Sequence, residues 1–442
     1  MKVAGLCALV ALAATLAGRA EVLAQGQQAP KPAVPVEAPK PPVAAEAPKP
    51  KPSAQELKRW RQTMVHAPPP EGTCFVAEYP ATAWTNAPCG KPPKNVTHQL
   101  GGPGGLPDFQ AATRIPVKSA EGSFDSVIGV HSACSAACTN GTCQTCTNLP
   151  NNFSLQLNTN IFPTRVSVSC NNNPKWNCQG WEQFVFSNRH CEGNGGQGEA
   201  CAYIEYWLYG YDPQHNTCPT GYQRAAAPPG LASGCVANSK NAVNLASLEV
   251  ADLGLMQLAG GAANAYVHND WVIFTYSTTS YLKKGDNRFT DLGQYWTQTE
   301  FNVFGIGNGD RVLFNPGSTL VVRIEVDNGT PNAPTCQLGG YGTSGESNNL
   351  NPIVLPTGST DAPNTGPAQT YSPNSNPNLF GFPQPIPVNT IPNTQQTDIY
   401  GGPSSAGGPA LVFGESNAPP GPVPDSDACA RAVTVGVGST HR

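Results

Sequence analysis

The sequence predicts an all-β fold, an antiparallel β-sandwich of two sheets that is stapled by disulfides. Three observations predict it. Short runs of alternating apolar and polar residues recur between residues 121 and 350, with turn-forming Asn, Gly and Pro residues between them. Few segments hold ten residues of helical period, and charged residues make up only 12% of the chain. The 15 cysteines, of which only Cys7 precedes residue 25, are enough for a framework of disulfides.

The first 70 residues precede the predicted sandwich. Residues 1–24 combine an early lysine, an apolar run and a small-residue cleavage site, which is typical of a secretory signal peptide too short to span a membrane. Residues 25–70 are rich in Pro, Ala and Lys, and we expect an extended spacer or a pro-segment. A capping box at Ser53 and Glu56 predicts a short basic helix to about Met64, which as part of a pro-segment would mask an acidic cleft. We therefore expect a secreted, extracellular protein without membrane insertion.

The predicted sandwich occupies residues 71–350, within which residues 245–258 fit either a helix or a pair of strands. After residue 350 the chain fills with Pro, Asn and Gly. Residues 351–442 are therefore expected to form a loosely ordered tail, which Cys429 ties back to the body. The segments that alternate like strands are 153–157, 165–169, 181–187, 202–210, 271–277, 300–304, 312–314 and 319–326.

Composition limits the partners and cofactors. The net charge of −4 lacks the basic footprint of a nucleic-acid-binding protein. Cys143 and Cys146 have zinc-site spacing beside Cys134 and Cys138, although an oxidising compartment favours disulfides there. A loop at residues 286–291 holds two aspartates that either bind calcium or face solvent. We expect no metal and no cofactor, expect a polypeptide or polysaccharide as partner, and leave the oligomeric state open.

Two neighbouring strands are predicted to present polar groups among aromatic rings. Alternation places Trp181 and Gln183 on one face of the first strand, and Tyr203, Glu205 and Trp207 on one face of the second. Such a surface suits a groove for an extended polymer, either peptide or polysaccharide. The alternative is that the aromatic rings belong to the core and the polar groups are exposed.

A third candidate is Glu300, which lies in a strand-like run and shares a face with Asn302 and Phe304. A charge within a buried strand is costly unless it is paired. The sequence therefore predicts either a glutamate at the solvent edge of a strand or a functional carboxylate.

The order of these features resembles the glutamic peptidases of the eqolisin type. That family has a Gln-bearing strand, then a strand of the type Trp-Tyr-Glu-Trp-Tyr and, much later, a strand with a catalytic Glu. Here Gln183 lies in Gln-Phe-Val-Phe, Glu205 in Tyr-Ile-Glu-Tyr-Trp and Glu300 in Thr-Glu-Phe-Asn-Val-Phe. The resemblance spans about residues 121–326 and implies a concanavalin-like jelly roll. The chain also resembles uncharacterised exported proteins with Cys-Gln-Gly-Trp-x-Gln-Phe segments.

The resemblance implies a secreted acid-acting endopeptidase. Glu300 would be the general base that activates water, and Gln183 would donate a hydrogen bond to the oxyanion, with Gln179 as a competing amide. An amide aimed at a developing oxyanion lowers a barrier by about 3–4 kcal/mol. A function from another class stays open, a non-catalytic extracellular protein that binds glycans or other polymers in the same groove. The residues expected to line the groove are Glu205, Trp181, Tyr203 and Trp207.

Overall fold

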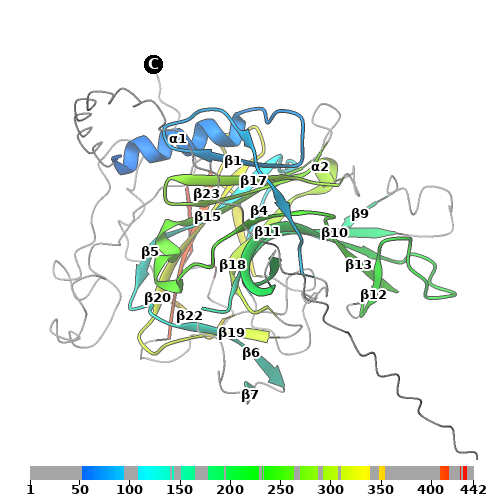
Figure 1. Ribbon diagram of the computed structural model, residues 1–442. Coiled ribbons are helices and arrows are strands. Elements are labelled where there is room, and N and C mark those ends of the chain that lie inside the picture. Colours follow the sequence, from blue (N-terminus) through cyan, green and yellow to red (C-terminus); the bar gives the residue numbers. More distant parts are fainter. Residues whose placement is uncertain are drawn as a thin grey trace, which may run out of the picture. The chain divides into compact units, whose positions relative to one another are not determined.

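Two antiparallel β-sheets packed face to face form most of the computed structural model, with the main apolar core between them (Figure 1). This confirms the predicted all-β sandwich, whereas its jelly-roll type stays a prediction. We name the sheet that contains the first strand sheet A and the other sheet B. The structure describes residues 52–93, 108–139, 142–143, 151–164, 178–193, 196–227, 231, 233–262, 269–286, 292–306, 310–338, 348–353, 409–417, 429 and 432–435.

Sheet A has ten antiparallel strands in the described part of the chain. Strand β20 pairs with β5 on one side and with β23 on the other, so this sheet joins three segments that are far apart in the sequence. In order across the sheet, the strands are β2 (Thr85–Asn86), β1 (Cys74–Glu78), β17 (Thr279–Lys284), β16 (Trp271–Tyr276), β15 (Met256–Gly261), β5 (Ser119–Ile128), β20 (Thr319–Asp327), β23 (Ala410–Ser416) and β22 (Asn351–Ile353), and β24 (Val433–Val435) also pairs with β23.

Sheet B has eleven strands in the described part of the chain, and its longest strands form the hairpin of β10 and β11. In order, its strands are β12 (Gln223–Ala225), β13 (Gly234–Asn238), β11 (Gly196–Tyr209), β10 (Gln179–Gly193), β8 (Ser154–Thr159), β18 (Gln298–Phe304), β4 (Phe109–Ala112) and β21 (Thr335–Leu338). Beside this path, β14 (Ala242–Leu245) pairs with β11 and with β3 (Cys89–Gly90), and β9 (Phe162–Pro163) pairs with β10.

The remaining elements are small. A third sheet joins β19 (Asp310–Phe314), β6 (Ala133–Thr139) and β7 (Thr142–Cys143), and α2 (Leu292–Tyr295) precedes β18. The ambiguous stretch 245–258 contains a 3₁₀ helix, η1 (Val250–Leu255), which runs directly into β15. The segment is therefore neither the long helix nor the strand pair that its pattern allowed.

Aromatic rings from both sheets meet in the core. Phe186 of β10 stacks on Phe274 of β16 with ring centroids 3.9 Å apart. The ring of Phe301 from β18 lies directly against Gly122 of β5, where a Cβ atom would overlap it. Glycine at this position therefore lets the two sheets approach closely around a large side chain.

Disulfides staple the described elements, as predicted. Their pairs are Cys74–Cys89, Cys191–Cys201, Cys218–Cys235 and Cys336–Cys429. Cys134 and Cys143 are disulfide-bonded as well, which argues against the zinc alternative at these two residues. Among the described residues, no group of three or more His, Cys, Asp or Glu side chains could hold a metal ion.

The sandwich extends beyond residue 350, where the sequence placed the start of a tail. Strand β23, Ala410–Ser416, lies between β20 and β22 in sheet A, and Leu411 and Phe413 are buried in the main core. The boundary is wrong because a short apolar strand is embedded in Pro- and Gly-rich sequence that masks its pattern. The expected tie at Cys429 is confirmed by its bond to Cys336 on β21.

The helix α1 (Ala54–His66) begins with the capping box that the sequence predicts. Its Trp60 and Met64 are buried against the outer face of sheet A, and Trp60 Nε1 donates a hydrogen bond to the carbonyl of Ala81 (Figure 1). Lys58 lies in the field of acidic groups on β5 and β20, among them Glu325. The helix thus covers an acidic face, but that face belongs to sheet A, opposite the strand faces that carry Gln183 and Glu300.

Several predictions lie outside the described residues. They concern the signal peptide at 1–24, the Pro-rich segment up to residue 51, the strand at 165–169, the far end of the possible calcium loop at 286–291, and most of 354–442. In the part of the chain that the structure describes, no helix has both the length and the apolar character needed to cross a membrane.

Candidate functional site

A row of polar side chains crosses sheet B on the face turned away from sheet A. The strand register places Glu205 opposite Gln183, Gln183 opposite Asn158, and Asn158 opposite Glu300. Gln110 of β4 follows opposite Glu300. Directly paired residues share a face of a sheet, and the residues that alternate with these fill the main core. We call these five residues the amide row.

Hydrogen bonds join the two predicted catalytic residues through a third. Asn158 Nδ2 donates to Glu300 Oε2 at 2.8 Å, and Gln183 Nε2 donates to Asn158 Oδ1 at 3.0 Å. Gln183 Nε2 also donates to Gln156 Oε1 at 3.0 Å. Glu300 lies in the middle of β18 and is 1% exposed, so its interpretation as a glutamate at a solvent edge is wrong.

The indole of Trp207 joins the other end of the row. Its Nε1 donates to Glu205 Oε1 at 2.7 Å and to Gln183 Oε1 at 3.0 Å. The ring of Trp181 lies beside it, with ring centroids 5.9 Å apart. The structure therefore brings together the neighbours that alternation predicted on β10 and β11.

These aromatic side chains lie beneath a cover instead of lining an open groove. Trp181 and Trp207 are at most 1% exposed, and they form a small apolar cluster against which Ala225 and Leu231 pack. Tyr203 lies in a separate buried cluster with the Cys191–Cys201 disulfide. The sequence could not predict this cover, because it depends on where the chain after β11 folds back. Contact with a polymer requires that the cover move.

A second polar row follows along β18, two residues beyond Glu300. Asn302 Nδ2 donates to both carboxyl oxygens of Asp108, at 3.1 and 2.9 Å, and to both of Glu415, at 3.1 Å each. Burial raises the pKa of Asp108 to about 6. Burial, followed by repulsion from Asp108, raises the pKa of Glu415 to about 8. Two buried acids thus share one amide group beside the amide row.

Sequence reasoning missed the residues that connect this site. Asn158 fell just beyond the predicted strand 153–157, although its alternation with Gln156 was a usable signal. Asp108 and Glu415 gave no signal, since each lies more than 100 residues from its partner Asn302. The structure also separates the two competing amides, because Gln179 pairs with Tyr209 at the end of the hairpin. Gln183 is the one that shares a row with Glu300.

The arrangement has the parts needed for acid–base chemistry at a carbonyl group. A carboxyl group and several carboxamides with fixed orientations lie on one face, and the carboxamides are held by hydrogen bonds to their neighbours. The polar groups of the row are carboxyl and carboxamide groups on neighbouring strands, and the described residues offer no cluster of metal ligands. The chain matches no protein-family model, and no curated protein or solved structure matches it either.

Proposed function

We propose that the protein is a secreted endopeptidase that works in acid and uses the amide row as its active site. The observation that carries the proposal is the row itself. Gln183, Asn158 and Glu300 lie side by side in it, and each is hydrogen-bonded to the next. This combination places a proton acceptor next to amide donors, which is what peptide hydrolysis through a tetrahedral intermediate requires.

In the proposed reaction, the Glu300 carboxylate takes a proton from a water molecule, whose oxygen attacks the scissile carbonyl carbon. The carbonyl oxygen becomes an oxyanion, and the N–H groups of Gln183 stabilise it once the substrate displaces one of their two present acceptors, Gln156 and Asn158. Collapse of the intermediate breaks the C–N bond, and the proton held by Glu300 passes to the leaving nitrogen. Asn158 is the positioning residue, because its amide orients the carboxylate and its carbonyl oxygen orients Gln183.

Access is part of the proposal. The side chains of the row are buried, and Ala225 and Leu231 cover the neighbouring tryptophans. We expect an extended polypeptide to displace this cover and to contact Trp181 and Trp207 with its side chains. The disulfide Cys218–Cys235 would keep the displaced segment attached to β13.

The test is cleavage of a denatured protein by oxidised, secreted material across about pH 2 to 8, where acidic enzymes are distinguished from neutral ones. Glu300→Gln is expected to abolish cleavage while the fold survives. Gln183→Leu, which removes the donor at similar volume, is expected to lower kcat about 10²–10³-fold.

Glu78→Gln is the matched control, since it removes the same charge from an exposed position on β1. It should cleave like the wild type. If the folded wild-type protein cleaves nothing at any pH, the peptidase proposal is abandoned. Binding of polysaccharides with the cover opened would then support the extracellular binding protein instead.

A further inference from the structure

The carboxyl groups of Asp108 and Glu415 come from segments of different sheets and meet at one side chain, Asn302. Asp108 directly precedes β4 of sheet B, and Glu415 lies on β23 of sheet A. The side-chain amide of Asn302 has two hydrogens, and it donates one to the carboxyl group of Asp108 and the other to that of Glu415. Both acids are at most 5% exposed.

The surroundings of this pair hold no positive charge among the described residues. Asp108 also accepts from the backbone N–H of Phe109 at 2.8 Å, and Glu415 accepts from Asn348 Nδ2 at 3.4 Å. Leu320 and Pro352, which flank Glu415 on β20 and β22, carry no charge. The nearest further acid along β18 is Glu300. Two adjacent ionised carboxylates without a cation are strongly disfavoured in a buried site, so the pair favours holding one proton.

A second pair joins the sheets elsewhere in the interior. Glu182 of β10 points into the core and is 0% exposed, and burial together with repulsion from Asp270, which directly precedes β16, raises the pKa of its carboxyl group. Neither oxygen of Glu182 accepts a hydrogen bond from the described residues. A buried carboxyl group without a donor, next to a second acid, favours its protonated form.

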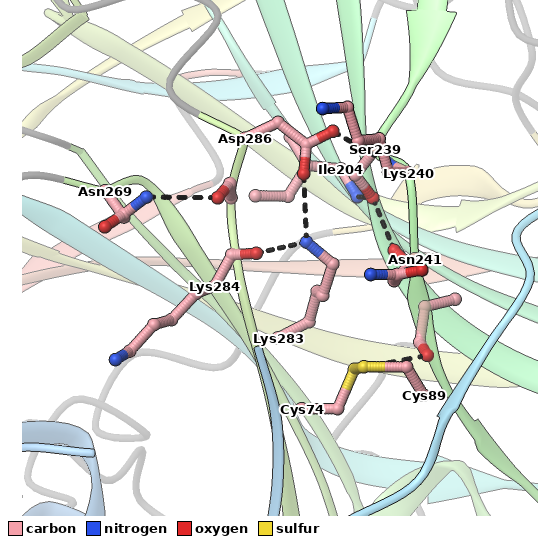
Figure 2. A network of polar contacts seen from close by, with 12 residues as sticks. Cys74, Cys89, Ile204, Ser239, Lys240, Asn241, Asn269, Lys283, Lys284 and Asp286 are labelled. Carbon is pink, nitrogen blue, oxygen red and sulfur yellow. Dashed lines mark hydrogen bonds and ion pairs between the residues drawn. A yellow bond between two sulfur atoms is a disulfide. The ribbon is translucent and has the colours of Figure 1, made fainter. Parts of the chain in front are cut away.

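Strands β11 and β17 bring further titratable groups close to the second pair. Tyr206 lies opposite Glu182 on β11, and its hydroxyl accepts from the backbone N–H of Asp286 at 2.9 Å. Lys283 of β17 is fully buried and pairs with Asp286 at 3.4 Å (Figure 2). Figure 2 shows its ammonium group directed at Asp286 and at the carbonyl of Lys284. Tyr206 lies in the field of all three acids, Asp270, Glu182 and Asp286, and Lys283 pairs with Asp286.

We propose that these two carboxyl pairs form a pH-dependent latch between the sheets, closed when each pair holds a proton and loosened when both acids of a pair ionise. The latch is a property of the fold and stands whether or not the amide row is catalytic. Each pair takes one acid from sheet A, or its edge, and one from sheet B. Loss of the shared proton therefore creates repulsion across the interface that holds the sandwich together.

The direction of the pH effect follows from the pKa shifts. The pKa values of Asp108 and Glu415 are raised to about 6 and about 8 in the folded protein, and that of Glu182 is raised as well. An acid whose pKa is raised on folding contributes stability fully below its unfolded pKa of about 4, and that contribution is lost as pH rises through the folded pKa. The folded state is expected to be most stable in acid and to weaken between about pH 5 and 9.

The first test is the melting temperature of the full chain, with disulfides intact, at about pH 5 and about pH 9. The wild-type Tm is expected to fall by about 5 °C or more between them. Asp108→Asn and Glu182→Gln each replace a proton-sharing acid by an amide of the same shape. Each is expected to reduce the fall, and the double variant to remove most of it.

Glu71→Gln, which removes an exposed charge, is the control and should melt like the wild type at both pH values. A wild-type Tm that does not fall, or that falls equally in the double variant, overturns the latch. If a variant fails to fold, the infrared spectrum of the wild type decides. A carbonyl band of protonated carboxyl groups at neutral pH, lost near pH 9, supports the latch, and its absence at neutral pH refutes it. Neither the melting temperature nor the infrared band depends on peptidase activity, so the latch is tested separately from the proposed function.

Discussion

Asparagine side chains organise both polar rows of sheet B. Asn158 donates to a carboxylate and accepts from an amide, and Asn302 donates to two carboxyl groups while its oxygen accepts from Asn348. A carboxamide is uncharged but offers both donors and an acceptor. It can therefore hydrogen-bond to buried acids on either side without placing another charge in the interior. Replacing it by an apolar side chain leaves buried polar groups without partners.

Asn158→Leu tests this at the position between Glu300 and Gln183. The change keeps the volume similar but removes the donor to Glu300, and we expect the free energy of unfolding to fall by about 2–4 kcal/mol. Urea unfolding with disulfides intact measures it. Asn86→Leu on the exposed strand β2 is the control and should change stability by less than about 0.5 kcal/mol. Equal, small effects in both variants would contradict the bridging role of Asn158.

Individual strands show what alternation can and cannot predict. The pattern on the β10–β11 hairpin correctly placed Gln183 and Glu205 on one face, because strand faces follow from local geometry alone. It could not predict the cover over Trp207, nor the insertion of β23 beside β20, because both depend on contacts between distant segments. Three of the five residues of the amide row were therefore predicted from the sequence, and Asn158 and Gln110 were missed.

The docking of helix α1 on sheet A depends on a few buried side chains. Trp60 is 4% exposed, and its ring lies edge-on to Tyr79 with centroids 5.9 Å apart. Removing a buried tryptophan costs about 3–5 kcal/mol, so Trp60→Ala is expected to detach the helix while the sandwich stays folded. Hydrogen exchange of residues 54–66 should become much faster. Arg59→Ala, exposed on the same helix, should leave the exchange unchanged, and slow exchange in both would refute the prediction.

The sandwich is closed by contacts between segments that lie far apart in the sequence. Residues near position 110 meet residues near 415 both in the core, where the rings of Phe109 and Phe413 stack at 4.2 Å, and at the pair of Asp108 and Glu415. Such long-range contacts carry a large closure entropy, which a covalent bond removes from the unfolded state. The Cys336–Cys429 disulfide, with a sequence separation of 93, has this role.

Removing that bond should therefore cost more than removing a short one. The double substitution of Cys336 and Cys429 by Ser is expected to lower the free energy of unfolding by about 4–5 kcal/mol, against about 3 kcal/mol for Cys218 and Cys235. The latter pair has a separation of only 17. Urea unfolding of both double variants measures the difference. The reverse order would show that native contacts, and not loop closure, decide the effect.

The same bond also makes the chain from Cys336 to Cys429 a covalent ring, and β23, which lies between β20 and β22 in sheet A, is within that ring. One cut of the backbone between residues 354 and 408 would open the ring without releasing either piece. The product would be a two-chain protein that runs as one species on a gel until a reductant separates it. Maturation by a protease, in an oxidising environment, is thereby compatible with an intact sandwich.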